Sequence, residues 1–397
     1  MTLSPSSPDG GPSAPSDACW SLVGRPRVTY QDRMTRILTI AVVVFGLRTA
    51  SADTFTVRLD SDTAVRVHAR HAGSGQNAHA LEFADGQLQV IPADRLIERV
   101  AGPDPTPVTF EAMLQQLADE FGADRIVSQV EKPFVITLVR ASNGALEPLV
   151  QRRLDAVLKK AGSFFKGMQA SFLEFVRQAR VETTPIKYPL VAVIFESDRQ
   201  FDAYTVSITG QQGLSPENIA AFYDLLSNRL VIRFRECNTF DTPLHEAVHQ
   251  QVYNRGILQR LAPVPAWFNE GIATGFEGDG ERIRGGPRVI SDRYGPMSLK
   301  ARVVDWREIV ANDRTFQGDV LAAEAYGHAW GMHWLLVTKY RSEYNKLVRH
   351  FAAKKPLELD RPDQRVEEFE QLLGKSVQEL QAEFYRDLPR ALARRRP

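Results

Sequence analysis

The chain has 397 residues, with 49 Lys and Arg against 48 Asp and Glu, and only 2 Cys. With 43% hydrophobic and 24% charged residues, its composition is that of a globular protein rather than a disordered one. A formal net charge of +1 gives no electrostatic reason to expect a nucleic acid as a partner. Two cysteines exclude a disulfide-dense scaffold and an all-cysteine zinc cluster.

The first 52 residues have the composition of a leader. Residues 1–33 are rich in Ser, Pro and Gly, and we expect them to be disordered or to precede a true start at Met34. Residues 34–52 combine a basic start, a short apolar run and a small-residue end at Ala52, the three parts of a signal peptide. The run is too short to span a bilayer, which needs about 20 apolar residues. We therefore expect a periplasmic, cell-envelope or extracellular protein without stable membrane insertion after cleavage; an uncut anchor is the alternative.

Cleavage after Ala52 would change the charge and the cysteine content. The leader carries five Arg, three Asp and Cys19, so the net charge of the mature chain becomes −1 and Cys237 becomes its single cysteine. The mature protein would then have no intrachain disulfide. Its near-neutral charge does not favour long-range electrostatic steering of a substrate.

Residues 53–145 are expected to form a small N-terminal α+β unit with a packing or docking role. Alternating apolar residues from Phe55 predict strands, and Asp85-Gly86 between two apolar segments predicts a hairpin. A Pro-rich turn at residues 102–107 precedes a helix that Thr109 can cap, and a strand follows at 134–139. The irregularly spaced His68, His71 and His79 give only weak support for a metal site here.

Residues 146–397 are expected to form the main domain, with a helical C-terminal part. Apolar periodicity predicts two helices between residues 149 and 176. The continuous apolar run Leu190–Phe195 predicts a central strand covered on both faces, and the alternation in residues 230–235 predicts a strand with one face partly solvated. The expected fold class is α+β.

The chemistry-bearing motif is His245-Glu246-x-x-His249. Thr242 as a cap and Pro243 at the first position predict a helix that Gly256 can end. On such a helix the two imidazoles lie one turn apart on one face and can bind one cation. Glu246 would lie beside the open metal position, where it can take a proton from water. The alternative is two surface histidines on an ordinary helix.

A third metal ligand is predicted at Glu270, in the apolar segment Pro265–Ala273. A catalytic zinc site uses three protein ligands and one water, and a carboxylate among apolar residues is costly to bury unless it binds a cation or is paired. A surface salt bridge is the alternative for Glu270. Glu277 is a weaker ligand candidate, for which a supporting or structural role is favoured.

With Trp267-x-x-Glu270-Gly271, these residues resemble the gluzincin zinc metallopeptidases of the thermolysin-like superfamily (the MA clan). The resemblance covers roughly residues 148–390 and is closest to a poorly characterised bacterial group with the same third-ligand motif. It implies a zincin-like domain with a mixed sheet over an active-site helix and a helical C-terminal lobe. It also implies one Zn²⁺ bound by His245, His249 and Glu270, with Glu246 as general base and then general acid. The strand at residues 230–234 would lie beside the active-site helix, with its free edge pairing with substrate backbone.

The sequence departs from this family at Thr274, where thermolysin-type enzymes have an Asp that orients a histidine. A hydroxyl accepts the imidazole N–H more weakly than a carboxylate does. Asp241 or Glu277 could supply a carboxylate instead.

An oxyanion donor is expected in the segment Ala325–Trp334. Related enzymes have a Tyr or His some tens of residues after the third ligand. Tyr326 is the first candidate and His328 the second. The alternative is that Tyr326 belongs to an aromatic core stripe with Trp330, His333 and Trp334.

Together these features predict an exported zinc metallopeptidase, a hydrolase whose partner is a peptide or protein substrate. A catalytically weak zinc-binding protein of the cell envelope is one alternative. A zinc amidase acting on cell-wall peptides is another.

Overall fold

The computed structural model describes residues 52–59, 63–145, 147–209, 219–278, 283–300, 304–316 and 320–394. The predicted signal peptide, apart from Ala52, and the residues before it lie outside these ranges. Among the helices within these ranges, none is both long and apolar enough to cross a membrane.

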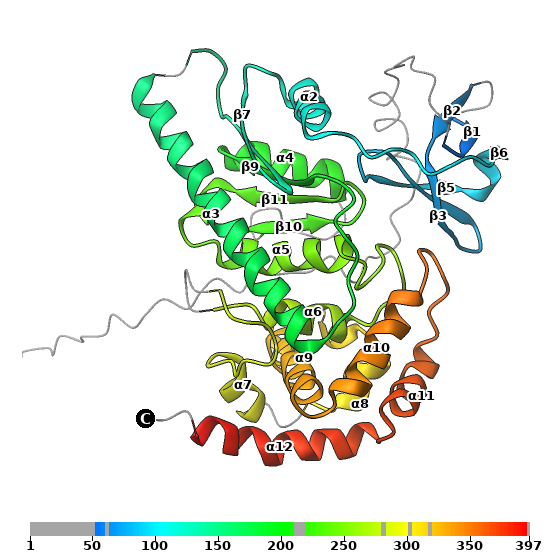
Figure 1. The fold of residues 1–397 in the computed structure, drawn as a ribbon, viewed down its shortest axis with the longest axis vertical. Coiled ribbons are helices and arrows are strands. Elements are labelled where there is room, and N and C mark those ends of the chain that lie inside the picture. The colour runs from blue at the N-terminus through cyan, green and yellow to red at the C-terminus, as the bar shows by residue number, and fades with distance from the viewer. Residues whose placement is uncertain are drawn as a thin grey trace, which may run out of the picture.

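A five-stranded mixed sheet lies in the upper half of the molecule as drawn in Figure 1, above the C-terminal helices. Its strand order is β10-β11-β9-β8-β7, with β8, β9 and β11 parallel and the two outer strands antiparallel to their neighbours. The predicted central strand is β9, which is buried along its whole length. The strands are β7 (Ile126–Glu131), β8 (Phe134–Val139), β9 (Leu190–Phe195), β10 (Ala221–Asp224) and β11 (Arg229–Arg233).

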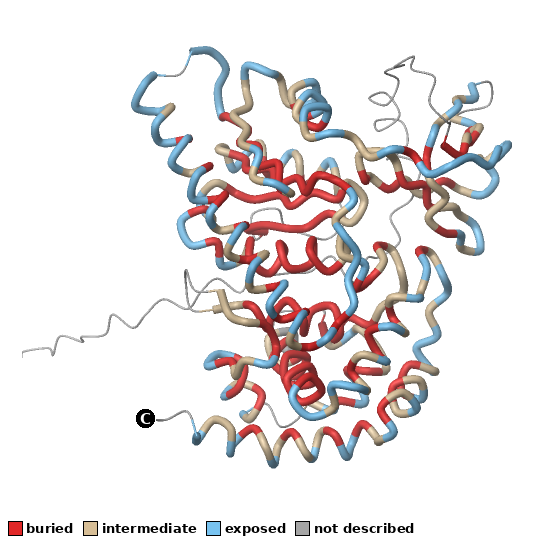
Figure 2. Tube along the Cα trace, in the orientation of Figure 1, coloured by how far each residue is buried: buried red, intermediate tan, exposed pale blue. Residues whose placement is uncertain are grey.

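Helices cover both faces of this sheet because successive strand residues point to opposite sides. Ala192 and Ile194 pack in the core that contains α3 (Pro148–Ala179) and α5 (Asp241–Asn254). Val191 and Val193 pack in a second core formed with α2 (Phe110–Phe121) and α4 (Asp198–Thr209). Figure 2 shows the buried residues concentrated in the sheet, in α5 below it and in the inner helices of the lower half of the molecule.

The two helices predicted between residues 149 and 176 are one long helix, α3. Gly162, near its middle, does not interrupt it. A Cβ at this position would lie 2.9 Å from Nε2 of Gln129 in β7, the far end of a flexible side chain that can move aside.

The N-terminal unit is smaller than predicted. Only β1 to β6 form sheets of their own, with strand orders β2-β1-β6 and β3-β4-β5. The expected boundary at residue 145 is corrected to the turn before α2, because β7 and β8 join the main sheet and α2 packs on it. Pairing with β9 buries the apolar β8, which a separate unit would leave partly exposed. The strands are β1 (Thr54–Arg58), β2 (Ala64–His68), β3 (Arg70–Ser74), β4 (Ala78–Glu82), β5 (Leu88–Pro92) and β6 (Leu96–Val100).

A helical lobe follows the sheet and completes the predicted α+β architecture (Figure 1). Its most buried members are α6 and α9, which α7, α8, α10 and α12 surround. The helices are α6 (Ala266–Thr274), α7 (Tyr294–Lys300), α8 (Trp306–Ala311), α9 (Val320–Lys339), α10 (Arg341–Ala353), α11 (Pro362–Leu373) and α12 (Val377–Ala393).

The strand predicted to have a free edge does not have one. β11 covers residues 229–233 and lies between β9 and β10, so both of its edges are paired. The preceding strand, β10, takes the edge position and packs on α5. The alternation in residues 230–235 predicted a half-solvated strand, but every residue of β11 is buried, and its two arginines are paired with acidic side chains of α2 and α4.

Candidate metal centre

The motif helix and the third-ligand helix bring three buried side chains together. α5 begins at Asp241, one residue before the predicted cap Thr242, and presents His245 and His249 on one face. α6 supplies Glu270, whose Oε2 lies 3.0 Å from Nε2 of His245 and 3.5 Å from Nε2 of His249. One ligand atom from each residue lies within 4.8 Å of the others, and the exposure of each residue is 3% or less. This cluster can hold a metal ion.

The chemistry of the three side chains suits zinc. Two imidazoles and one carboxylate form a donor set used by catalytic zinc sites. Nε2 of His249 is buried without a hydrogen bond, although it lies 3.5 Å from the Glu270 carboxylate, and a cation bound to both groups would satisfy them. Burial opposes ionisation of Glu270, but the charge of His249 and a hydrogen bond from His245 outweigh it and hold the pKa of Glu270 well below its usual range. The carboxylate is therefore an anion at neutral pH.

Each histidine is oriented through its other ring nitrogen. Nδ1 of His245 lies 2.7 Å from Oε1 of Glu277, and Nδ1 of His249 lies 3.2 Å from Oδ1 of Asn269. Both partners are oxygen acceptors, so each Nδ1 can donate its proton to its partner, and an Nε2 atom that gives up its own proton then presents a lone pair to a cation. Asn269 had not been predicted. The sequence feature that could have pointed to it is its polar side chain directly before Glu270 in an otherwise apolar helix.

Glu277 supplies the carboxylate that the family pattern places at Thr274. The Thr274 hydroxyl donates to the backbone carbonyls of Glu270 and Gly271 and makes no hydrogen bond to a histidine. Asp241, the other sequence candidate, is exposed at the start of α5. Glu277 is also bound by the Tyr294 hydroxyl at 2.5 Å and by Arg293 at 3.2 Å.

Glu246 lies on the same helix and points toward the edge strand. Its Oε2 accepts a hydrogen bond from the backbone N–H of Tyr223 in β10 at 2.9 Å. Its Oε1 is buried without a hydrogen-bond partner. Burial raises the pKa of Glu246, which favours a group that can both take and return a proton. A backbone donor such as Tyr223 N–H leaves no side-chain signal in a sequence.

The structure brings Tyr326 to the centre but not His328. The Tyr326 ring lies 6.0 Å from the His245 ring, and Phe316 packs edge-on against it. His328 accepts a hydrogen bond from Nε1 of Trp306 and packs against Phe384 on another side of α9. Two residues along a helix are rotated by about 200°, so both side chains cannot face the same site.

Other residues of α9 support the third-ligand helix. His333 contacts the backbone carbonyl of Phe268 through Nε2 at 2.9 Å and the Tyr344 hydroxyl through Nδ1 at 3.1 Å. Burial lowers the pKa of His333 to about 3, so the ring is neutral. Trp330 stacks on Trp334. The other residues of the predicted aromatic stripe, Trp330, His333 and Trp334, therefore belong to the buried core next to Tyr326.

The remaining sequence candidates lie elsewhere. His71 and His79 both contact the Ser74 hydroxyl in the N-terminal unit. Among the residues that the structure describes, the only group of three or more side chains placed to hold a metal is the one on α5 and α6. Cys237 is buried, and burial raises the pKa of its thiol to about 12.

A comparison with models of protein families gives a match in the second half of the chain. Residues 239–358 match a family described as a protein of unknown function, DUF1570. The matched range contains His245, Glu246, His249, Glu270 and Tyr326. No curated protein matches the chain.

Proposed function

We propose that this chain is an exported zinc-dependent metallopeptidase with a zincin-like fold. One observation carries the proposal. His245, His249 and Glu270 converge from two helices beside the buried carboxylate of Glu246. The expected ligands are the two Nε2 atoms and the Glu270 carboxylate. When bound, zinc would supply a Lewis acid that polarises a carbonyl and lowers the pKa of water.

Glu246 acts as the general base in this proposal. Its free Oε1 takes a proton from the attacking water, while the Tyr223 N–H fixes the position of Oε2. Water oxygen bonds to the peptide carbonyl carbon, the C–N bond breaks, and Glu246 returns the proton to the leaving amine. The raised pKa of Glu246 matches a group that takes up and releases one proton per turnover.

Tyr326 stabilises the negative charge that develops on the carbonyl oxygen. Its position against the His245 ring favours this role, and a phenolic O–H donates a hydrogen bond without carrying charge. An extended peptide would pair with the edge strand β10, which is hydrogen-bonded to Glu246 through Tyr223.

The proposal is tested with Glu246→Gln in the mature chain, using zinc content and hydrolysis of a peptide library as readouts. We expect one zinc per chain in both proteins and a loss of hydrolysis of about 10²–10⁴-fold in the variant. Glu236→Gln, outside the centre, is the control and should hydrolyse at the wild-type rate. Retained hydrolysis in Glu246→Gln at normal zinc content would refute the assigned role.

The same assay separates the alternatives. Cleavage of muropeptides without cleavage of protein would favour the amidase. Zinc binding by the wild type without hydrolysis of either substrate would favour the binding protein. The departure at Thr274 no longer supports weak catalysis, because Glu277 provides a carboxylate to His245.

A further inference from the structure

The N-terminal unit makes a buried polar contact with the main domain. Glu82, at the end of β4, has one carboxylate oxygen bound by Arg70 and by the Tyr188 hydroxyl, at 2.6 and 2.9 Å. Its other oxygen accepts a hydrogen bond from Arg260, in the segment after α5, at 3.0 Å. The side chains of Glu82 and Arg260 are 10% and 7% exposed. A buried pair of this kind needs additional hydrogen bonds to offset the loss of solvation.

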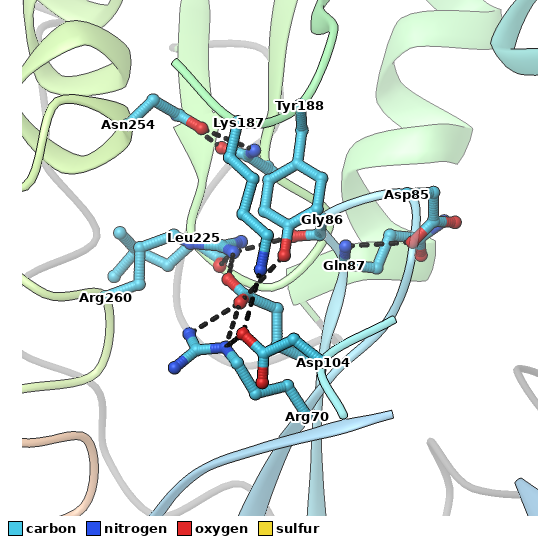
Figure 3. A network of polar contacts seen from close by, with 12 residues as sticks. Arg70, Asp85, Gly86, Gln87, Asp104, Lys187, Tyr188, Leu225, Asn254 and Arg260 are labelled. Atoms are coloured by element: carbon cyan, nitrogen blue, oxygen red, sulfur yellow. Dashed lines mark hydrogen bonds and ion pairs between the residues drawn. The ribbon is translucent and has the colours of Figure 1, made fainter. Parts of the chain in front are cut away.

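Arg260 supplies those hydrogen bonds by reaching both domains (Figure 3). It donates to the carbonyl of Gly86 in the N-terminal hairpin at 2.6 Å and to the carbonyl of Leu225 at 3.0 Å. Leu225 begins the turn between β10 and β11. A second contact reaches the same turn, because the Leu88 N–H donates to the carbonyl of Leu226 at 2.7 Å.

The same turn is bonded to the metal-site helix. Asn228, which ends the turn in a left-handed conformation, exchanges two side-chain hydrogen bonds with Asn254 of α5. Its backbone carbonyl accepts from Gln250, one helical turn before Asn254. Its side chain also accepts from the Tyr223 hydroxyl at 2.6 Å. Glu246, Gln250 and Asn254 thus form one polar row along α5 that faces the hairpin.

These contacts form a continuous connection to Glu246. Arg260 and Leu88 hold the turn, the turn fixes the end of β10, and β10 carries the Tyr223 N–H that binds Glu246. β10 is four residues long and is paired on one side only, so its own sheet contacts are few. Catalytic groups need to be held within about 0.5 Å of their working positions.

We propose that the N-terminal unit is a clamp that positions Glu246 through the β10–β11 hairpin, with Arg260 as the positioning residue. The unit would then be part of the working site rather than a separate docking module. The catalytic consequence rests on the proposed function. The structural consequence, that these contacts order the β10–β11 hairpin, does not rest on the proposed function.

The test measures hydrogen–deuterium exchange in the full mature chain for wild type, Arg260→Met and Arg260→Lys. We expect the amides of residues 221–229 to exchange at least about fivefold faster in Arg260→Met, the factor that corresponds to losing one net hydrogen bond. Arg260→Lys keeps the charge but not the forked contacts, so it should give an intermediate rate. It also provides the measurement if Arg260→Met fails to fold. Zinc content should stay at one ion per chain.

Arg99→Lys is the matched control. Arg99 pairs with Asp53 inside the N-terminal unit and does not reach the β10–β11 hairpin. We expect wild-type exchange at residues 221–229 in this variant. The proposal that the N-terminal unit holds the β10–β11 hairpin would be overturned by either of two results. One is unchanged exchange of the amides of residues 221–229 in both Arg260 variants; the other is an equal increase in their exchange in Arg99→Lys.

Hydrolysis gives an independent readout. If the wild type cleaves peptides, Arg260→Lys should lower kcat about tenfold, because a misplaced base affects the chemical step, and leave KM within about twofold. A change in KM alone would contradict positioning of Glu246. If the wild type cleaves nothing, the proposed function fails, and the exchange rates still decide whether the clamp exists.

Discussion

At the scale of single residues, the orientation of the two histidines depends on two different acceptors. Glu277 is an anion bound to His245, and burial, which opposes its ionisation, is outweighed by the His245 hydrogen bond, so that the pKa of Glu277 is lowered. Asn269 is a neutral amide bound to His249. The carboxylate raises the basicity of its imidazole more than the amide does. His245 should therefore be the ligand more sensitive to loss of its partner.

We predict that Glu277→Gln weakens zinc binding at least about tenfold, since loss of an outer partner of a zinc ligand costs about 10–100-fold. Competition with a chromophoric chelator measures the affinity. Thr274→Val is the matched control, because the Thr274 hydroxyl bonds only to carbonyls of its own helix. Equal affinities of the two variants would contradict the role given to Glu277.

At the scale of elements, Glu270, the predicted third ligand, is placed by the packing of α6 on α9. Gly271 follows Glu270 and faces α9. A Cβ there would lie 2.5 Å from the carbonyl oxygen of Ala329 and 2.5 Å from Cδ2 of His333. The glycine therefore lets the two helices approach closely, and the carbonyl contact of His333 with Phe268 forms across that approach.

Gly271→Ala should lower the free energy of unfolding by about 1–3 kcal/mol, the range for overpacking a tight core. Gly167→Ala is the control. This glycine is also helical, but its nearest contact to an added Cβ is 3.4 Å, so the change should be neutral or stabilising by up to about 1 kcal/mol. Urea unfolding measures both variants. A Gly271→Ala protein as stable as Gly167→Ala would rule out the close approach.

At the scale of the whole molecule, the metal centre and Glu82 each join separate parts. The candidate centre takes two side chains from the helix under the sheet and one from the helical lobe. Glu82 joins the N-terminal unit to the main domain. Burial opposes ionisation of Glu82, but the charges of Arg70 and Arg260 outweigh it and hold its pKa below the ordinary value of 4.5.

This pKa shift predicts a pH dependence of stability. A carboxyl group with a lowered pKa in the folded protein contributes stability above its unfolded pKa, and that contribution is lost as the pH falls through the folded value. The melting temperature of wild type should exceed that of Glu82→Gln at pH 6–7, and the gap should narrow below pH 4.5. Glu98 is exposed in the same unit, so Glu98→Gln should have the same melting temperature as wild type. If the difference in melting temperature between wild type and Glu82→Gln stayed constant down to pH 3, Glu82 would not be ionised and paired in the folded protein.

The amino-acid sequence by itself was enough to single out the candidate metal-binding residues and several of the elements that carry them. A helix places residues four apart on one face whatever surrounds it, so His245 and His249 could be paired without a structure. The predicted central strand, the hairpin at Asp85-Gly86 and the Thr109 cap are confirmed for the same reason, because they depend on local geometry. Glu270 stood out as a charge in an apolar helix.

Only the tertiary structure decided which distant groups meet. Strand pairing moved β7 and β8 into the main sheet and made β10 the edge strand instead of β11. The rotation of α9 brought Tyr326 to His245 and took His328 to Trp306. Glu277 reaches His245 across 32 residues, and the Tyr223 donor is a backbone group. Such contacts depend on how elements pack together, and the periodicity of one segment carries no information about the rotation or register of another.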